Sequence, residues 1–264
     1  MAVAFLQRGR VTALDYRCEA RPGDKPFPEL HGSMSISYVR SGSFGYRARG
    51  ASYELVAGSV LVGNAGDEFV CTHRYAYGDE CLSFHLAPEI AEEIAGEEFW
   101  RSGALAPLAE TAVFGELAQA AAEQRAFVSI DEAALLLAHR CASLGGANTR
   151  GIRASERDQR RAVEAALWLD EHCAEYAGLD EASKVCGLSP FHFLRLFTRV
   201  VGSTPHQYVV RSRLRRAARE LALSDRPITE IALECGFNDV ANFTRTFRRA
   251  AGRSPSAYRN FCKA

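Results

Sequence analysis

The sequence lacks the long apolar runs of a membrane protein. No stretch approaches the roughly 20 consecutive apolar residues that a membrane-spanning helix needs. Residues 1–10 show neither the basic start nor the long apolar core of a secretory signal peptide. The eight cysteines are scattered, and a chain of 264 residues can build a core without disulfides, so we expect reduced thiols. These absences predict a cytoplasmic protein with no membrane partner.

The chain also lacks a net charge, but the balance hides an asymmetry. Residues 157–264 hold 18 basic and 12 acidic side chains, whereas residues 1–156 hold 14 basic and 20 acidic ones. Most of the basic side chains in the second segment are arginine, which can grip a phosphate with two hydrogen bonds. A basic segment suits a polyanionic partner such as nucleic acid. Charge alone would also fit a solvated helical face.

Short strand-like segments fill the chain between Ser35 and Leu86. The candidate strands are 35–40, 53–56, 60–62, 68–71 and 81–86, and Gly42, Gly45 and Gly50 are expected to punctuate them. Strands this short and regularly spaced indicate an antiparallel barrel or sandwich. From Pro88 to Leu144 apolar residues recur at helical spacing, and a glycine-rich polar linker follows.

Everything after about Ser155 reads as helix. The expected helices are 157–175, 180–186, 190–201, 206–223, 228–235, 239–250 and 255–261. The fold class is therefore α+β with two domains: an antiparallel β-barrel plus helices, then an all-α domain of seven helices. The expected boundaries are 1–144 for the first domain, 145–156 for the linker and 157–264 for the second domain.

The helical segment contains an internal repeat at a spacing of 50 residues. Phe193 matches Phe243 and Arg195 matches Arg245, and seven identities fall in register over 16 positions. Such a repeat indicates a duplicated supersecondary unit.

Each copy has the pattern of a helix-turn-helix, at about 179–201 and 228–250. A short helix ends at a glycine, Gly187 or Gly236, and Ser189 or Asp239 can cap the helix that follows. In that helix an apolar stripe at helical spacing should face the core, with an arginine on the opposite face of both copies. A duplicated bundle built for packing alone would not explain this exposed arginine.

Two runs carry a family resemblance. GLSPFHFLRLFTRVVGSTPHQY from Gly187 and ITEIALECGFNDVANFTRTFRRAAGRSPSAYR from Ile228 closely resemble the AraC/XylS family of bacterial transcription regulators. The resemblance implies a seven-helix DNA-binding domain in which a long helix joins two helix-turn-helix units. It also implies a double-stranded DNA partner, RNA polymerase as a second partner and a role as an activator or a repressor of transcription, not an enzyme.

The family's base-reading positions fall on identifiable residues. They are Phe191, Leu194 and Arg195 in the first recognition helix, and Ala241, Asn242, Thr244 and Arg245 in the second. The phosphate contacts are expected from Arg199, Arg215, Arg248 and Arg249, with the other arginines of 211–219 in the same role.

The N-terminal half resembles the family only in layout, with a cupin-like barrel followed by helices. This layout implies an unknown small-molecule effector bound in the barrel between Ser35 and Leu86, and a homodimer formed through the helices. A stripe on those helices could form the dimer interface or pack against the barrel: Leu108, Leu117, Ala121, Leu135 and Leu136. No close histidine pair with a glutamate follows Tyr53–Gly66, so no cofactor and no cupin-type enzyme are expected.

Two cysteines and two histidines form a weaker constellation. Cys71 and His73 share one strand face, and Cys81 and His85 share another. As an alternative to a small-molecule effector, these four could hold zinc or another soft metal, or sense oxidants. Buried thiols with hydrogen-bonded histidines would explain the same pattern.

Overall fold

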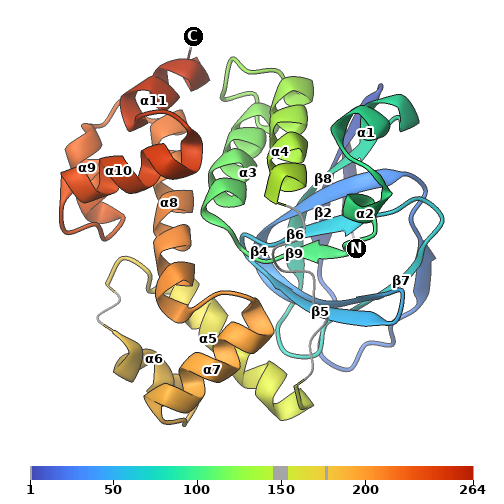
Figure 1. The fold of residues 1–264 in the computed structure, drawn as a ribbon, viewed down its shortest axis with the longest axis horizontal. Coiled ribbons are helices and arrows are strands. Elements are labelled where there is room, and N and C mark those ends of the chain that lie inside the picture. Colours follow the sequence, from blue (N-terminus) through green and yellow to red (C-terminus); the bar gives the residue numbers. More distant parts are fainter. Residues whose placement is uncertain (1, 145–153, 176–177, 264) are drawn as a thin grey trace.

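The computed structural model describes residues 2–144, 154–175 and 178–263 (Figure 1). Its strands are β1 (Ala2–Gln7), β2 (Val11–Cys18), β3 (Pro28–Leu30), β4 (Met34–Ala48), β5 (Ala51–Val56), β6 (Val60–Gly63), β7 (Glu68–Thr72), β8 (Asp79–Leu86) and β9 (Ala104–Leu105). Its helices are α1 (Pro88–Ile94), α2 (Glu97–Trp100), α3 (Ala109–Ala122), α4 (Ile130–Leu144), α5 (Glu156–Glu171), α6 (Leu179–Val185), α7 (Pro190–Val201), α8 (Pro205–Leu223), α9 (Ile228–Glu234), α10 (Val240–Ala251) and α11 (Pro255–Lys263). The α+β fold class is confirmed, with an antiparallel sheet first and seven helices in the described residues from 154 onward.

Strand β4 is 15 residues long and pairs with four other strands. Its first half pairs with β8 and β6, and its second half pairs with β5 and β7, so one long strand belongs to two sheets. The expectation that Gly42 and Gly45 interrupt the strand pattern is wrong. Gly42 has φ +76°, and a Cβ there would lie 2.3 Å from the carbonyl oxygen of Gly78. The glycine therefore lets the strand bend, next to a bulge at Val39/Ser41, while pairing continues on both sides.

The strands β1 and β2 were not expected from the sequence. Strand β2 pairs with β8 over its whole length, from Val11 opposite Leu86 to Cys18 opposite Asp79. Val11, Ala13 and Leu14 are buried, and β2 thereby forms one wall of the sheet domain.

The apolar core continues from the sheet into the helical part. One cluster contains Ile36 and Phe84 of the sheet, Leu117 of α3, and Phe243 and Phe247 of α10. A second cluster joins Val56 of β5 to Phe193 and Phe197 of α7.

Helix α8 connects the two ends of the helical part (Figure 1). Helices α5, α6 and α7 lie at its N-terminal end and α9, α10 and α11 at its C-terminal end. Helix α3 packs along α8, and α4 packs on α3, so this pair stands between α8 and the strands. Most of the predicted linker, residues 145–153, lies outside the described residues. No described helix is both long and apolar enough to cross a membrane.

Candidate DNA-binding surface and sheet cavity

The first helix-turn-helix consists of α6 and α7. Gly187, with φ +61°, makes the turn between them, and the Ser189 side chain accepts a hydrogen bond from the backbone N–H of His192. Pro190 occupies the first turn, and Gly202 ends α7 in the left-handed region at φ +77°. The apolar stripe behaves as expected, because Phe193, Leu196, Phe197 and Val200 are all buried.

The second helix-turn-helix, α9 and α10, repeats this construction. Gly236 has φ +88°, and a Cβ there would lie 2.5 Å from the carbonyl oxygen of Ala174, so no other residue fits the turn without movement. Asp239 caps α10 by accepting hydrogen bonds from the N–H groups of Ala241 and Asn242. Cys186 and Cys235 are buried in the two units, as their positions predicted.

The seven candidate base-reading side chains share the outward faces of α7 and α10. Phe191 is 64% exposed, and the Arg195 guanidinium carbon lies 5.7 Å from its ring centroid. Five of the seven are exposed and two half-buried: Phe191, Arg195, Ala241, Asn242 and Arg245 in the first group, Leu194 and Thr244 in the second. Arg195 and Arg245 occupy equivalent positions of the repeat.

Three of the four candidate phosphate contacts are also on the surface. Arg199, Arg248 and Arg249 are exposed in the last turns of α7 and α10. Arg215 is not, and the expectation that it contacts phosphate is wrong for this structure. Its side chain is buried, and its Nη2 atom lies 2.6 Å from Oδ2 of Asp170.

The other α8 arginines also bond to groups of the protein itself, although the Arg219 side chain is half exposed. Arg219 donates to the buried carboxylate of Glu116 on α3, at 2.9 Å. Arg211 donates to the carbonyl oxygen of Pro107, and Arg216 to those of Asp170 and Glu171. The arginines of 211–219 were expected to bind phosphate. In the structure they instead join α8 to α3, to α5 and to the segment at Pro107.

A polar cluster joins the sheet, α3, α5 and α8. Tyr38, Glu116 and Arg215 are its buried centre, and the less buried Asp170 and Arg219 lie at its edge. The Tyr38 hydroxyl donates to Glu116 at 3.0 Å, and Arg215 Nε lies 3.8 Å from the same carboxylate. Burial lowers the pKa of Arg215, but Asp170, Tyr38 and Glu116 together outweigh it and leave that pKa raised. Burial also raises the pKa of Tyr38, and the Glu116 charge adds to this. Sequence patterns gave no sign of this cluster, because its members come from four separate elements.

The candidate dimer stripe is largely used within the chain. Leu117 and Ala121 are buried, and α3 packs against α4, α8 and α10. These two residues therefore cannot form a dimer surface, which favours the packing alternative for them. Leu135 and Leu136 are half-buried and pack against the same core.

The two sheets line a cavity of about 510 Å³ that is partly open to solvent. Its lining mixes apolar and polar side chains from β2, β4, β7, β8 and the segment before β4, among them Tyr16, His31, Phe44, Phe69, Ser83 and His85. His31 is buried, stacks on Phe69 and shares a 2.9 Å hydrogen bond with the Tyr46 hydroxyl. Burial lowers the pKa of His31 to about 4. The alternation of β2 could have revealed this wall of the cavity.

The four candidate metal ligands all line this cavity but do not form one ligand set. Among the described residues, the only His/Cys/Asp/Glu group that could hold a metal is Cys18, His73 and Asp79. Of the predicted four, only His73 belongs to it. His85 instead shares hydrogen bonds with Ser33 and Ser83, and Cys81 lies 3.2 Å from the Asp79 carboxylate. The four-residue site of Cys71, His73, Cys81 and His85 is therefore not assembled.

These two helix-turn-helix units, with equivalent exposed arginines, define a DNA-binding protein. A helix-turn-helix domain model matches residues 182–260. The chain is 38% identical over 102 residues to the regulatory protein SoxS of Escherichia coli (strain K12). This alignment covers 39% of this chain and 95% of SoxS. It is 35% identical over 96 residues to the probable transcriptional regulator LumQ of Photobacterium leiognathi, but covers only 39% of that protein. The chain belongs to the AraC/XylS family and is a DNA-binding transcription regulator.

Two solved structures are also similar to parts or most of this chain. The DNA-binding domain of AdpA in complex with a target DNA is 33% identical to this chain, with a TM-score of 0.37. The match covers 38% of this chain and 90% of the AdpA chain. ToxT of Vibrio cholerae O395 covers 96% of this chain and 98% of its own at 12% identity, with a TM-score of 0.38.

Proposed function

We propose that this regulator reads DNA sequence with the exposed faces of α7 and α10. The observation that carries the proposal is the equivalent placement of Arg195 and Arg245 on the outward faces of two capped recognition helices. Arginine pairs with guanine in the major groove, asparagine such as Asn242 pairs with adenine, and Phe191 or Ala241 suits a thymine methyl group. Arg199, Arg248 and Arg249 would hold the phosphates on either side.

The length of α8 fits two successive contacts with one face of the duplex. The helix has 19 residues and is therefore about 28 Å long. Successive major-groove faces are about 34 Å apart, and each recognition helix lies beyond an end of α8. One monomer would then cover two half-sites roughly one helical turn apart.

The sheet cavity is the proposed effector site. Its volume falls within the roughly 300–1,000 Å³ of small-molecule sites, and a few polar groups converge in a largely apolar lining. Strand β5 pairs with β4, whose residues Ser35, Ser37 and Phe44 line the cavity, and β5 lies close to the DNA-binding part. The Tyr208 hydroxyl of α8 donates to the carbonyl oxygen of Ala57 at 3.4 Å, and Val56 belongs to the core of the first helix-turn-helix. An effector that shifts β5 would therefore act on α7 and α8.

Family resemblance supports the remaining parts of the proposal. It favours a cytoplasmic, non-enzymatic transcription regulator that works as a homodimer, with RNA polymerase as a partner. The proposed division into an effector domain 1–144, a linker 145–156 and a DNA-binding domain 157–264 follows the same layout. The alignment with SoxS supports it, because the matched segment makes up 95% of that protein.

Selection of binding sites from a random duplex pool with the full-length chain tests the proposal. The selected sequences should share two conserved blocks about one helical turn apart, with guanine in each block. Arg195→Ala should lose the preference in one block and Arg245→Ala in the other. A pool without a common motif, or variants that select the same motif as the natural chain, would contradict base reading by α7 and α10.

A further inference from the structure

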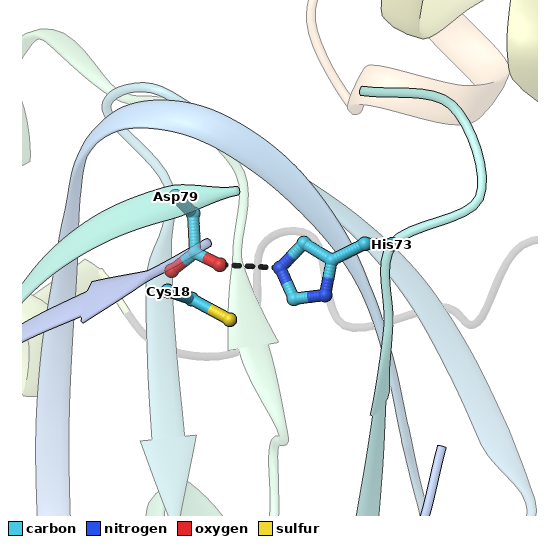
Figure 2. A group of neighbouring side chains, drawn as sticks. All are labelled: Cys18, His73 and Asp79. Atoms are coloured by element: carbon cyan, nitrogen blue, oxygen red, sulfur yellow. Dashed lines mark hydrogen bonds and ion pairs between the residues drawn. The ribbon is translucent and has the colours of Figure 1, made fainter. Parts of the chain in front are cut away.

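We propose that Cys18, His73 and Asp79 form a binding site for a divalent transition-metal ion such as Zn²⁺, at one end of the sheet cavity. Figure 2 shows the three side chains converging. One donor atom from each residue lies within 4.8 Å of the other two. His73 Nε2 and Asp79 Oδ1 are 2.6 Å apart.

The backbone holds two of the three ligands in place. Cys18 ends β2 and Asp79 begins β8, and the two residues are directly opposite each other in the antiparallel register. Gly78, immediately before, donates its N–H to the Ala20 carbonyl oxygen at 3.0 Å. A Cβ on Gly78 would lie 2.1 Å from the Cys18 carbonyl oxygen, so only glycine permits this close approach. The pair therefore sits on strand ends whose spacing is fixed by the sheet.

His73 reaches the pair from the far end of the segment that joins β7 to β8. The side chains of His73 and Asp79 are 7% and 9% exposed, so the donors face the interior. The next two residues of this segment contact α5: Arg74 lies 2.7 Å from Glu156, and the Tyr75 hydroxyl donates to Gln159 at 3.2 Å. The proposed site is thus at the base of a segment that touches the DNA-binding part.

The donor set matches the chemistry of a zinc-like ion. Thiolate, imidazole and carboxylate are the three ligand types that Zn²⁺ takes, at about 2.0–2.3 Å each. Ligands on a tetrahedral ion of that size lie roughly 3.3–3.8 Å apart, so shifts of about 1 Å or less would assemble the site. The ion would replace the hydrogen bond between His73 and Asp79. Three protein ligands leave a fourth position, which water or an effector atom in the cavity can fill.

Metal binding at this site must release the thiol proton of Cys18. Because the ion binds the thiolate form of Cys18, metal affinity should fall as the pH is lowered. This coupling separates binding at Cys18 from binding by surface carboxylates.

Cobalt titration of the metal-free full-length chain, under a reductant that does not bind metal, tests the proposal. One equivalent of Co²⁺ should produce tetrahedral d–d bands with a thiolate charge-transfer band, and one equivalent of Zn²⁺ should remove them. Cys18→Ser should abolish the charge-transfer band. His73→Gln and Asp79→Asn should each weaken the affinity by at least about tenfold.

Cys71→Ser and His85→Gln are the matched controls, because both residues line the same cavity outside the proposed ligand set. Each should keep the cobalt spectrum, and circular dichroism should show that all five variants fold. Absence of tetrahedral cobalt bands in the natural chain would overturn the proposal. So would a charge-transfer band that survives in Cys18→Ser but disappears in Cys71→Ser.

Discussion

The surroundings of each arginine decide its role in the helical part. Arg195 and Arg245 project from the outward faces of the recognition helices α7 and α10, neither of which contains an acidic residue. Arg199 and Arg249 are exposed at helix ends, where they can reach phosphate. Arg215 is buried against Asp170 and Glu116 and stabilises the fold.

Arg245→Ala should relax base preference without unfolding the protein. Loss of a paired guanine contact costs about 1–3 kcal/mol of discrimination at one or two base pairs. Arg249→Ala is the comparison: it should weaken binding to all sequences alike and reduce the salt slope by about one ion. Affinities on a selected and a scrambled site at several salt concentrations separate the two. If Arg245→Ala weakens both sites equally, Arg245 contacts phosphate.

Arg215→Ala should destabilise the fold instead of acting on DNA directly. Removal of one partner from a buried ion pair costs about 3–5 kcal/mol, because Asp170 and Glu116 keep their charges without it. Denaturant unfolding of the full-length variant measures this cost. An unchanged unfolding free energy together with a reduced salt slope for DNA binding would restore the phosphate role.

His31 should make the sheet domain sensitive to acid. Its pKa is about 4 in the folded protein and about 6.5 when unfolded, so folding favours the neutral ring. The stabilisation is fully present above pH 6.5 and is lost as the pH falls toward 4, by on the order of 2–3 kcal/mol. His31→Gln should flatten the unfolding free energy over that window, measured by urea titration at several pH values. His139→Gln, on the exposed side of α4, should leave the pH dependence unchanged.

At the scale of elements, helices were more predictable than strands. The boundaries of α7 were predicted without error, because Ser189, Pro190 and Gly202 mark its ends by local chemistry. The long β4 was predicted in fragments, since a glycine that bends a strand looks like one that ends it. The proposed metal site was missed for a similar reason: Cys18 and Asp79 become neighbours only through the pairing of β2 with β8.

Phe197→Ala and Phe247→Ala should each disrupt one helix-turn-helix. Both rings are completely buried and pack edge-on against Tyr208 and Tyr258, respectively. Truncation of a core phenylalanine costs about 3–5 kcal/mol. Circular dichroism melting should show the loss, together with loss of DNA binding. Arg195→Ala, in the same helix as Phe197, should lose base preference while its melting stays unchanged, and a destabilised Arg195→Ala would contradict its surface role.

At the scale of the whole molecule, the contact between α3 and α8 places the DNA-binding part on the sheet domain. Helix α8 carries one helix-turn-helix at each end, so its position against α3 decides where both recognition helices point (Figure 1). Polar groups as well as apolar ones hold this contact, including the Arg219 guanidinium of α8, which donates to the Glu116 carboxylate of α3 at 2.9 Å. No local pattern predicts this arrangement, because the partners are about 100 residues apart.

Glu116 is the residue through which this arrangement is best tested. Its buried carboxylate accepts hydrogen bonds from Tyr38 and Arg219 and faces Arg215. Glu116→Ala leaves one buried arginine short of a counter-charge and should lower the unfolding free energy by about 3–5 kcal/mol. Glu116→Gln keeps an acceptor for Tyr38 and should cost less. Glu132→Ala, on the exposed surface of α4, is the control and should stay within about 0.5 kcal/mol. Denaturant unfolding followed by circular dichroism distinguishes these cases. If Glu116→Ala unfolds like the control, the polar cluster does not hold α8 against α3, and the apolar packing of Leu117 and its neighbours does so alone.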